Sequence, residues 1–355
     1  MKQPWAWVAW LVTAVIILSI TRNPLYLVLI LMCVSFVGMV LRQAGGDVRN
    51  PFPLWKLALW IMLLSTVFNA LTSHYGETVL FTIPGNLPLL SGPVTLEAMV
   101  YGAINGLILT GMLASFVVLN LALTVRELIS LIPQAFFPLA VVTSIAVTYI
   151  PTTIRQFHKI REAQAIRGHQ MRTLRDWLPL WMPLLVGGLE HAMQLAEAMT
   201  ARGFASTRPS ADEKRNFPRL VMVVGLVLLS LGWIIQLGGA GLYGTSLLVA
   251  GAALIIGGIW YMGRKSTRTT YHNPGWTWQD VLTVLVSLLI LAICVLPIPW
   301  ISHESLYYDP YPTLTLPLFD PLLGATILGL LIPGLLKLMR IQPTRKSHHK
   351  LAEPG

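Results

Sequence analysis

Apolar residues gather along the chain in long runs that polar stretches separate. There are nine such runs, at residues 5–20, 25–41, 55–72, 96–123, 134–150, 218–238, 244–262, 279–297 and 319–338. About 20 apolar residues in a helix cross a bilayer, so most of the runs are suited to membrane spans. The run at 134–150 differs, because it continues without a turn signal into a charged stretch. The pattern therefore predicts an all-α integral membrane protein in which one helix leaves the membrane.

The distribution of lysine and arginine indicates which runs cross the membrane. The loops at 73–95 and 298–318 contain no Lys or Arg, so the positive-inside rule places both outside the cell. Nine spans would put these loops on opposite sides, whereas eight spans with a cytoplasmic segment at 124–217 put both outside. With the N-terminus inside, only Arg22 of the 25 basic residues lies outside. We expect a multi-pass protein of the cell (plasma or inner) membrane with both termini in the cytoplasm.

This topology divides the chain into four parts. They are an N-terminal four-helix membrane part (1–123), a cytoplasmic insertion (124–217), C-terminal membrane helices (218–340) and a basic cytoplasmic tail (341–355). Composition agrees, with 55% hydrophobic and 11% charged residues. The net charge of +10 does not indicate nucleic acid, because the basic residues flank spans and form no clustered, aromatic-interleaved surface. Membrane lipid is an expected partner and nucleic acid is not.

The cytoplasmic insertion is predicted to hold two long helices of similar design. The first covers 134–167 and the second begins near Asp176, and each is apolar in its first half and polar in its second. Proline removes a backbone N–H and bends a helix, so Pro151 in the first helix and Pro179 and Pro183 in the second are candidate hinges. The alternative, that these prolines only mark breaks at the membrane interface, stays open.

Both predicted helices end in an arginine followed by a glycine. The motif residues are Ala165, Ile166, Arg167 and Gly168 in the first helix and Ala201, Arg202 and Gly203 in the second. Glycine can take the left-handed conformation that stops a helix, and arginine interacts favourably with the dipole at a helix C-terminus. Capping alone explains one such pair. Two pairs in the same cytoplasmic insertion, each after a half-apolar helix, indicate a paired docking device.

With these two motifs, the chain resembles the transmembrane T component (the EcfT or CbiQ-like family) of energy-coupling factor transporters. The resemblance covers about residues 20–240. It implies a short coupling helix at 124–133, followed by the two long ones, whose motif residues dock on two ABC-type ATPase subunits. It also implies an ATP-driven importer in which a separate substrate-binding S component selects a vitamin or a transition-metal ion. The sequence does not identify that cargo.

The chain departs from the family pattern in three respects. His191 stands where the family usually has an arginine, eleven residues before the second motif arginine. Thr200 stands where the family commonly has an acidic residue. Three more spans follow the single one with which the family usually ends, and the resemblance gives them no role.

The sequence carries no motif for catalysis. No G-x-x-x-x-G-K-S/T run occurs, the closest one (258–266) lies at a predicted span end, and Glu190-His191 belongs to no H-E-x-x-H motif. We therefore expect no enzyme activity, cofactor or metal in this chain, with ATP hydrolysis in partner subunits. The alternatives are a stand-alone secondary transporter and an intramembrane enzyme. Intramembrane acids are few, and Glu97 and Asp320 are predicted near the outer ends of spans, which disfavours the proton relay of a secondary transporter.

Overall fold

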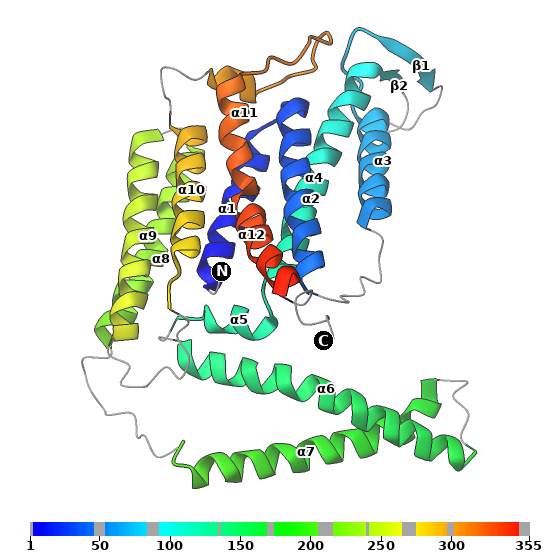
Figure 1. Cartoon of the computed structure of the whole chain (residues 1–355), viewed down its shortest axis with the longest axis vertical. Coiled ribbons are helices and arrows are strands. Elements are labelled where there is room, and N and C mark those ends of the chain that lie inside the picture. Colours follow the sequence, from blue (N-terminus) through cyan, green and yellow to red (C-terminus); the bar gives the residue numbers. More distant parts are fainter. Residues whose placement is uncertain are drawn as a thin grey trace, which may run out of the picture. The chain divides into compact units, whose positions relative to one another are not determined.

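The computed structural model describes residues 3–45, 54–83, 92–133, 136–168, 174–204, 216–238, 241–264, 275–296 and 302–347. Within them the chain is almost entirely helical, with one small two-stranded sheet (Figure 1). The longer elements are α1 (Pro4–Ile20), α2 (Pro24–Gly45), α3 (Leu54–Thr72), β1 (Val79–Ile83), β2 (Gly92–Thr95), α4 (Leu96–Ala122), α6 (Phe137–Ile166), α7 (Leu178–Ala201), α8 (Asn216–Leu237), α9 (Gly241–Arg264), α10 (Trp278–Val295) and α12 (Ile332–Ser347). The short ones are α5 (Val125–Ser130), η2 (Leu174–Trp177), η4 (His303–Leu306), α11 (Pro321–Ile327) and η5 (Leu328–Leu331).

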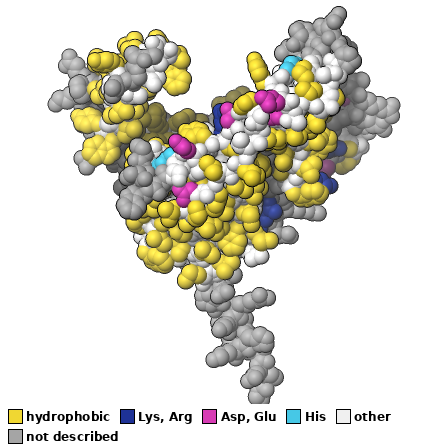
Figure 2. Space-filling model, turned by 90° about the horizontal axis from the view of Figure 1, so that it is seen from above, with side chains coloured by type: hydrophobic (Ala, Val, Ile, Leu, Met, Phe, Trp, Pro, Cys, Tyr) yellow, Lys and Arg dark blue, Asp and Glu magenta, His cyan; other side chains and the backbone are white. Residues whose placement is uncertain are grey.

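Membrane-spanning character is clear from the helices themselves. Seven candidate spans lie in the described residues, in α2, α3, α4, α8, α9, α10 and the segment Pro321–Met339. The helix α1 is apolar but shorter, with 17 residues, and it completes the predicted eight. In the described part of the chain, α6 is not among the helices suited to a span. Figure 2 shows apolar side chains over much of the coloured surface, so the all-α membrane fold is confirmed.

Contacts group the elements into two compact units. The first is Met1–Thr124 together with His272–Gly355, and the second is Val125–Tyr271. The four spans after residue 217 are therefore shared, since α8 and α9 belong to the second unit and the later ones to the first. The two units divide after Thr124 and after Tyr271, so no division between them falls at the expected 217/218 boundary. The part of the expected tail at 348–355 lies outside the described residues.

In the first unit, helices from the two ends of the chain share one core. The helix α1 packs against α4 and α10, and α2 packs against α4 and α12 (Figure 1). The Nε1 of Trp10, a side chain with 1% exposure, donates to the carbonyl of Leu330 at 3.0 Å. That carbonyl belongs to η5, a 3-10 turn shortly before Pro333, where the missing N–H of proline favours a local change in helix winding.

A second polar contact ties the α1–α2 turn to the C-terminal segment. Asn23 is buried, and its Nδ2 donates to the carbonyls of Ser305 and Leu318, both at 2.7 Å. Its Oδ1 accepts from the N–H of Leu25. Both N–H groups of this amide therefore hold the α1–α2 turn to the 302–320 segment, and its oxygen serves the first turn of α2.

The sheet is an element that the sequence analysis treated as loop. Strand β1 pairs antiparallel with β2, and Thr95 at the end of β2 caps α4 by accepting from the N–H of Ala98. Glu97, in the first turn of α4, is fully buried and accepts from both the N–H and the hydroxyl of Thr78. The run Val79–Ile83 is rich in β-branched and aromatic residues, which was an available signal for a strand.

In the second unit, α8 and α9 form a closely packed pair. A Cβ added at Gly251 would lie 2.8 Å from the carbonyl of Gly225 and from the backbone N of Leu229. Small residues allow this backbone approach, which is a common way for helices to associate in membranes. The remaining elements of this unit, α5 to α7, carry the candidate site.

Candidate functional site: the ends and crossing of α6 and α7

The first predicted arm is a single helix. The 30 residues of α6 correspond to about 45 Å at 1.5 Å per residue, and Pro151 lies inside the helix without ending it. The short α5 precedes it and covers Val125–Ser130, where a helix at 124–133 was expected. The sequence thus predicted both the continuity of the arm and the short helix before it.

The second arm begins with the 3-10 turn η2 and continues as α7 over 24 residues. Pro179 stands in the first turn of α7, where the missing N–H of proline has no helical partner to lose. Pro183 lies inside the helix. The hinge role of Pro151, Pro179 and Pro183 stays a prediction, and Pro179 has the position of an ordinary helix start.

The glycine of each motif stops its helix in the predicted way. Gly168 has φ +79° and Gly203 has φ +76°, both in the left-handed region. The N–H of Gly168 donates to the carbonyl of Ala165 at 3.0 Å, and that of Gly203 donates to the carbonyl of Thr200 at 2.9 Å. After α7 the N–H of Phe204 also donates to the carbonyl of Met199, which completes a Schellman motif.

The arginine of each motif is the C-cap residue of its helix. Arg167 caps α6 and Arg202 caps α7, and both side chains are exposed. Ile166, directly before the first arginine, is 88% exposed. The two helices run in opposite directions, so the two arginine-glycine ends lie at opposite ends of the α6–α7 pair (Figure 1). Each end therefore presents a guanidinium on a rigid, exposed helix terminus.

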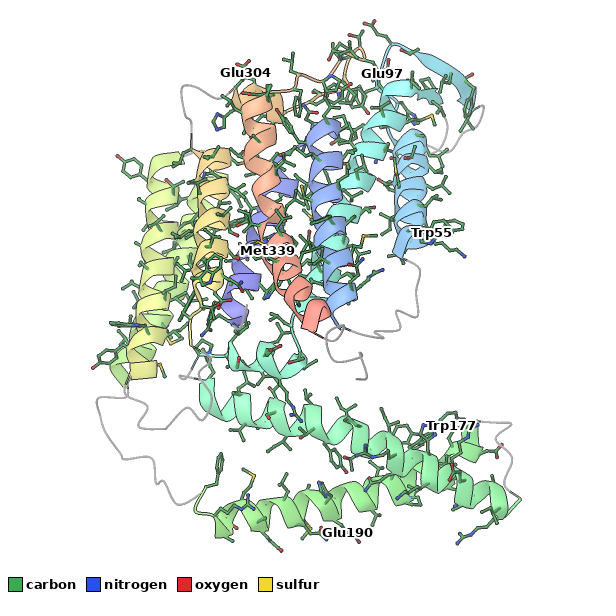
Figure 3. The ribbon with its side chains drawn as sticks, viewed as in Figure 1. Trp55, Glu97, Trp177, Glu190, Glu304 and Met339 are labelled. Carbon is green, nitrogen blue, oxygen red and sulfur yellow. The ribbon has the colours of Figure 1, made fainter. Side chains whose placement is uncertain are left out.

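Two aromatic stacks join α6 and α7. The rings of Tyr149 and His191 are 5.0 Å apart with an interplanar angle of 12°. Those of Phe157 and Trp177 are 6.4 Å apart at 22°. Figure 3 places Trp177 at the start of α7, next to α6. The sequence analysis noted His191 only as a departure and did not identify these stacks, because pairing between two helices is not visible in either helix alone.

Beyond the stacks, α7 carries exposed apolar side chains. Met182, Leu185 and Leu189 are 59%, 60% and 64% exposed. Their spacing of three and four residues places them along one face of the helix. Among the described residues, no group of three or more His, Cys, Asp or Glu side chains is placed to hold a metal ion. What α6 and α7 offer is thus two basic ends and an apolar face, which are features of a contact surface.

Comparisons with known proteins give consistent matches to one family. The model of the family CbiQ, described as cobalt transport protein, matches residues 2–211. The energy-coupling factor transporter transmembrane protein EcfT of Heliobacterium modesticaldum is 31% identical over 193 residues, covering 49% of this chain and 71% of that protein. EcfT 1 of Listeria monocytogenes is 24% identical over 225 residues, covering 57% and 80%. EcfT of Limosilactobacillus fermentum is 26% identical over 202 residues, covering 54% and 73%.

The family match contains both arginine-glycine motifs and ends before the last four long elements. Residue 211 precedes the start of α8 at Asn216. The helices α10 to α12, which complete the core of the first unit, therefore lie beyond the part of the chain that the family model matches.

Proposed function

The chain belongs to the CbiQ family of cobalt transport proteins, and from this premise we propose that it is the transmembrane coupling subunit of an ATP-driven importer of the energy-coupling factor type. Its work is mechanical: it links ATP hydrolysis in partner subunits to a separate membrane subunit that binds the cargo. The names of its relatives, transmembrane proteins of energy-coupling factor transporters, support the class of transporter. The observation that carries the coupling role is the pair of exposed arginine-glycine ends on α6 and α7.

The proposed partners at these ends are two ABC-type ATPase subunits. Ala165, Ile166, Arg167 and Gly168 enter a groove on one ATPase, and Ala201, Arg202 and Gly203 enter a groove on the other. In each groove the guanidinium reaches a carboxylate in a charge-assisted bond, for which its planar fork of donors is suited. Small side chains next to the arginine allow the helix end to approach the groove closely.

The coupling step follows from the placement of the two ends. When ATP closes the ATPase pair, the grooves move and carry the helix ends with them. Because the ends belong to two helices that cross, α6 and α7 change their angle. The apolar halves of these helices then pass the movement to the substrate-binding S component. A vitamin or a transition-metal ion is the proposed cargo, and the S component selects it.

The proposed orientation places α5 to α7 and both chain termini in the cytoplasm. Support comes from the loops at 73–95 and 298–318, which contain no Lys or Arg, and from the basic residues that flank the other ends of the spans. In this orientation the arginine ends face the compartment that holds ATP. The chain itself is proposed to have no catalytic role.

Charge reversal of the two motif arginines tests the proposal. Arg167→Glu together with Arg202→Glu is expected to leave the protein in the membrane but to abolish co-purification of the ATPases. Truncating one partner of a buried interfacial charge pair costs about 2 to 5 kcal/mol, and reversal adds repulsion. Each single reversal is expected to weaken recovery of the ATPases less than the double change does.

Arg161→Glu is the matched control. Arg161 is an exposed arginine on the same helix and lies about one turn before the motif. Its reversal is expected to leave recovery of the ATPases unchanged. Unaltered ATPase binding by the double variant overturns the proposal, and cargo uptake by the purified chain alone favours a stand-alone secondary transporter instead.

A further inference from the structure

Tyr149 contacts α7 at two positions on one face. Its ring stacks on His191 with centroids 5.0 Å apart. Its hydroxyl lies 3.3 Å from the place that a Cβ on Gly188 would take. Residues three apart are neighbours on a helix surface, so Gly188 and His191 together form a seat for one tyrosine. The absence of a side chain at Gly188 leaves the room that the hydroxyl occupies.

The second stack lies further along α6. Phe157, which stacks on Trp177, is eight residues after Tyr149 in sequence, or about 12 Å along the helix. Its partner Trp177 lies in η2, before α7 begins. Of the two ring stacks, that of Tyr149 is therefore the one made between the interiors of both long helices.

We infer that Tyr149, seated on Gly188 and His191, is the pivot about which α6 and α7 turn. Stacked rings stay in contact when one ring turns in its own plane, so the seat tolerates a change of crossing angle. Sliding of one helix along the other is different, because it would move the Tyr149 hydroxyl off Gly188 and against a neighbouring side chain. The inference rests on the proposed function, since turning matters only if partner subunits move the helix ends.

The test measures movement of the helices in the full chain bound to its ATPases. Spin labels are placed on cysteines that replace Lys159 and Gln194, two exposed positions between the crossing and the arginine ends. The native Cys33 and Cys294 are buried, with 2% and 4% exposure, so the introduced sites take the label. Pulsed electron paramagnetic resonance then reports the distance between labels before and after trapping with ATP and vanadate. The parent protein is expected to show a shift in this distance.

Two adjacent glycines supply a matched pair of variants. Gly188→Leu displaces Tyr149 and is expected to abolish the ATP-dependent shift. Gly187 has nothing within 4 Å of an added Cβ, so Gly187→Leu is expected to preserve the shift. Both changes raise helix propensity alike, so a difference between them reflects the seat. If Gly188→Leu does not assemble, Tyr149→Ala makes the same comparison.

Equal shifts in the two glycine variants would overturn the pivot. In that case both variants still bind the ATPases and the parent still shows the shift. A failure of the proposed function appears differently, as loss of the ATPases or as no shift in the parent.

Variants of His191 test the stacked ring. His191→Ala is expected to lose the ATP-dependent shift. His191→Phe keeps a ring against Tyr149, so it is expected to restore the shift. Retention of the full shift in His191→Ala contradicts the seat, and so does loss of the shift in His191→Phe.

Discussion

The core of the first unit and the α6–α7 pair use polar and aromatic groups in opposite ways. In the first unit, Trp10 and Asn23 are buried and direct their N–H groups to carbonyls of the C-terminal segment. In the α6–α7 pair, the arginines are exposed, and two ring stacks supply the cross-helix contacts described above. Buried hydrogen bonds of this kind fix which helices pack together, because an unpaired group in the membrane is costly. The difference indicates that the first unit is held by its own contacts, whereas α6 and α7 keep exposed groups at their ends, as the proposed docking on other subunits requires.

The largest effect on stability is expected from a change in the core of the first unit. Trp10→Ala removes a buried indole and leaves the carbonyl of Leu330 without that donor, so we expect a loss of about 3 to 5 kcal/mol in the free energy of unfolding. The matched change Trp181→Ala, on α7, removes a side chain that is 53% exposed and is expected to have little effect. Thermal unfolding in detergent, followed as loss of monodisperse protein, measures both. Similar destabilisation by the two changes would contradict the comparison.

A smaller loss is expected at the α1–α2 turn. Asn23→Ala leaves the carbonyls of Ser305 and Leu318 without the donor that serves both, and we expect a total loss of about 1 to 3 kcal/mol. Asn120 is the control, because it donates only to the carbonyl of Phe116 in its own helix and is exposed. In the same unfolding assay, Asn23→Ala is expected to have a lower unfolding midpoint than Asn120→Ala. Equal midpoints would show that the hydrogen bonds from Asn23 to the C-terminal segment do not stabilise this core.

At the ends of α6 and α7 the expected effects are local. Gly168→Ala and Gly203→Ala force a side chain into left-handed backbone, which costs about 1 to 2 kcal/mol. Hydrogen exchange of the last helical turn is expected to become faster in each variant. Gly187→Ala, inside α7 with open space around it, is expected to slow exchange, since alanine stabilises a helix interior by about 0.5 to 1 kcal/mol relative to glycine. Slower exchange in all three variants would show that the left-handed ends are not required.

The smallest effect concerns pH. The backbone N–H of Leu322, and then that of Ser302, hold the pKa of the Asp320 carboxyl below its ordinary value. A depressed pKa in the folded state means that this carboxylate contributes stability above its unfolded pKa, about 4, and loses it as the pH falls through the folded value. Asp320→Asn keeps a capping side chain, and its stability is expected to fall less as the pH is lowered. Unfolding midpoints of the parent and of Asp320→Asn, measured from pH 6 downward, test this expectation. If the midpoint of Asp320→Asn falls with pH as steeply as that of the parent, other groups cause the loss of stability in acid.

Much of the architecture could be predicted because membrane spans and helix ends leave local signals. The apolar runs gave the spans within a few residues, and the left-handed conformation of Gly168 and Gly203 follows from glycine after a helical pattern. The continuity of α6 through Pro151 was likewise predicted from the absence of a turn signal. These features depend on residues that are close together in the sequence.

What could not be predicted depends on residues that are far apart. Trp10 lies within the first apolar run, and nothing near it in sequence indicated a bond to Leu330. The seat of Tyr149 joins two helices, and the sequence pattern of neither helix alone indicates this contact. The β1–β2 hairpin is different, since its strand signal was present and was outweighed by the view of 73–95 as a loop between spans.

The hydrogen bond between Trp10 and Leu330 joins residues 320 positions apart, which sets an order of events during synthesis. A ribosome has to add 320 residues after Trp10 before the partner of this indole exists. Until then, the helices made first lie in the bilayer with an incomplete interface. Maturation of this protein is therefore expected to be limited by the helices α10 to α12, and termination before residue 330 is expected to leave a product that membrane quality-control proteases recognise.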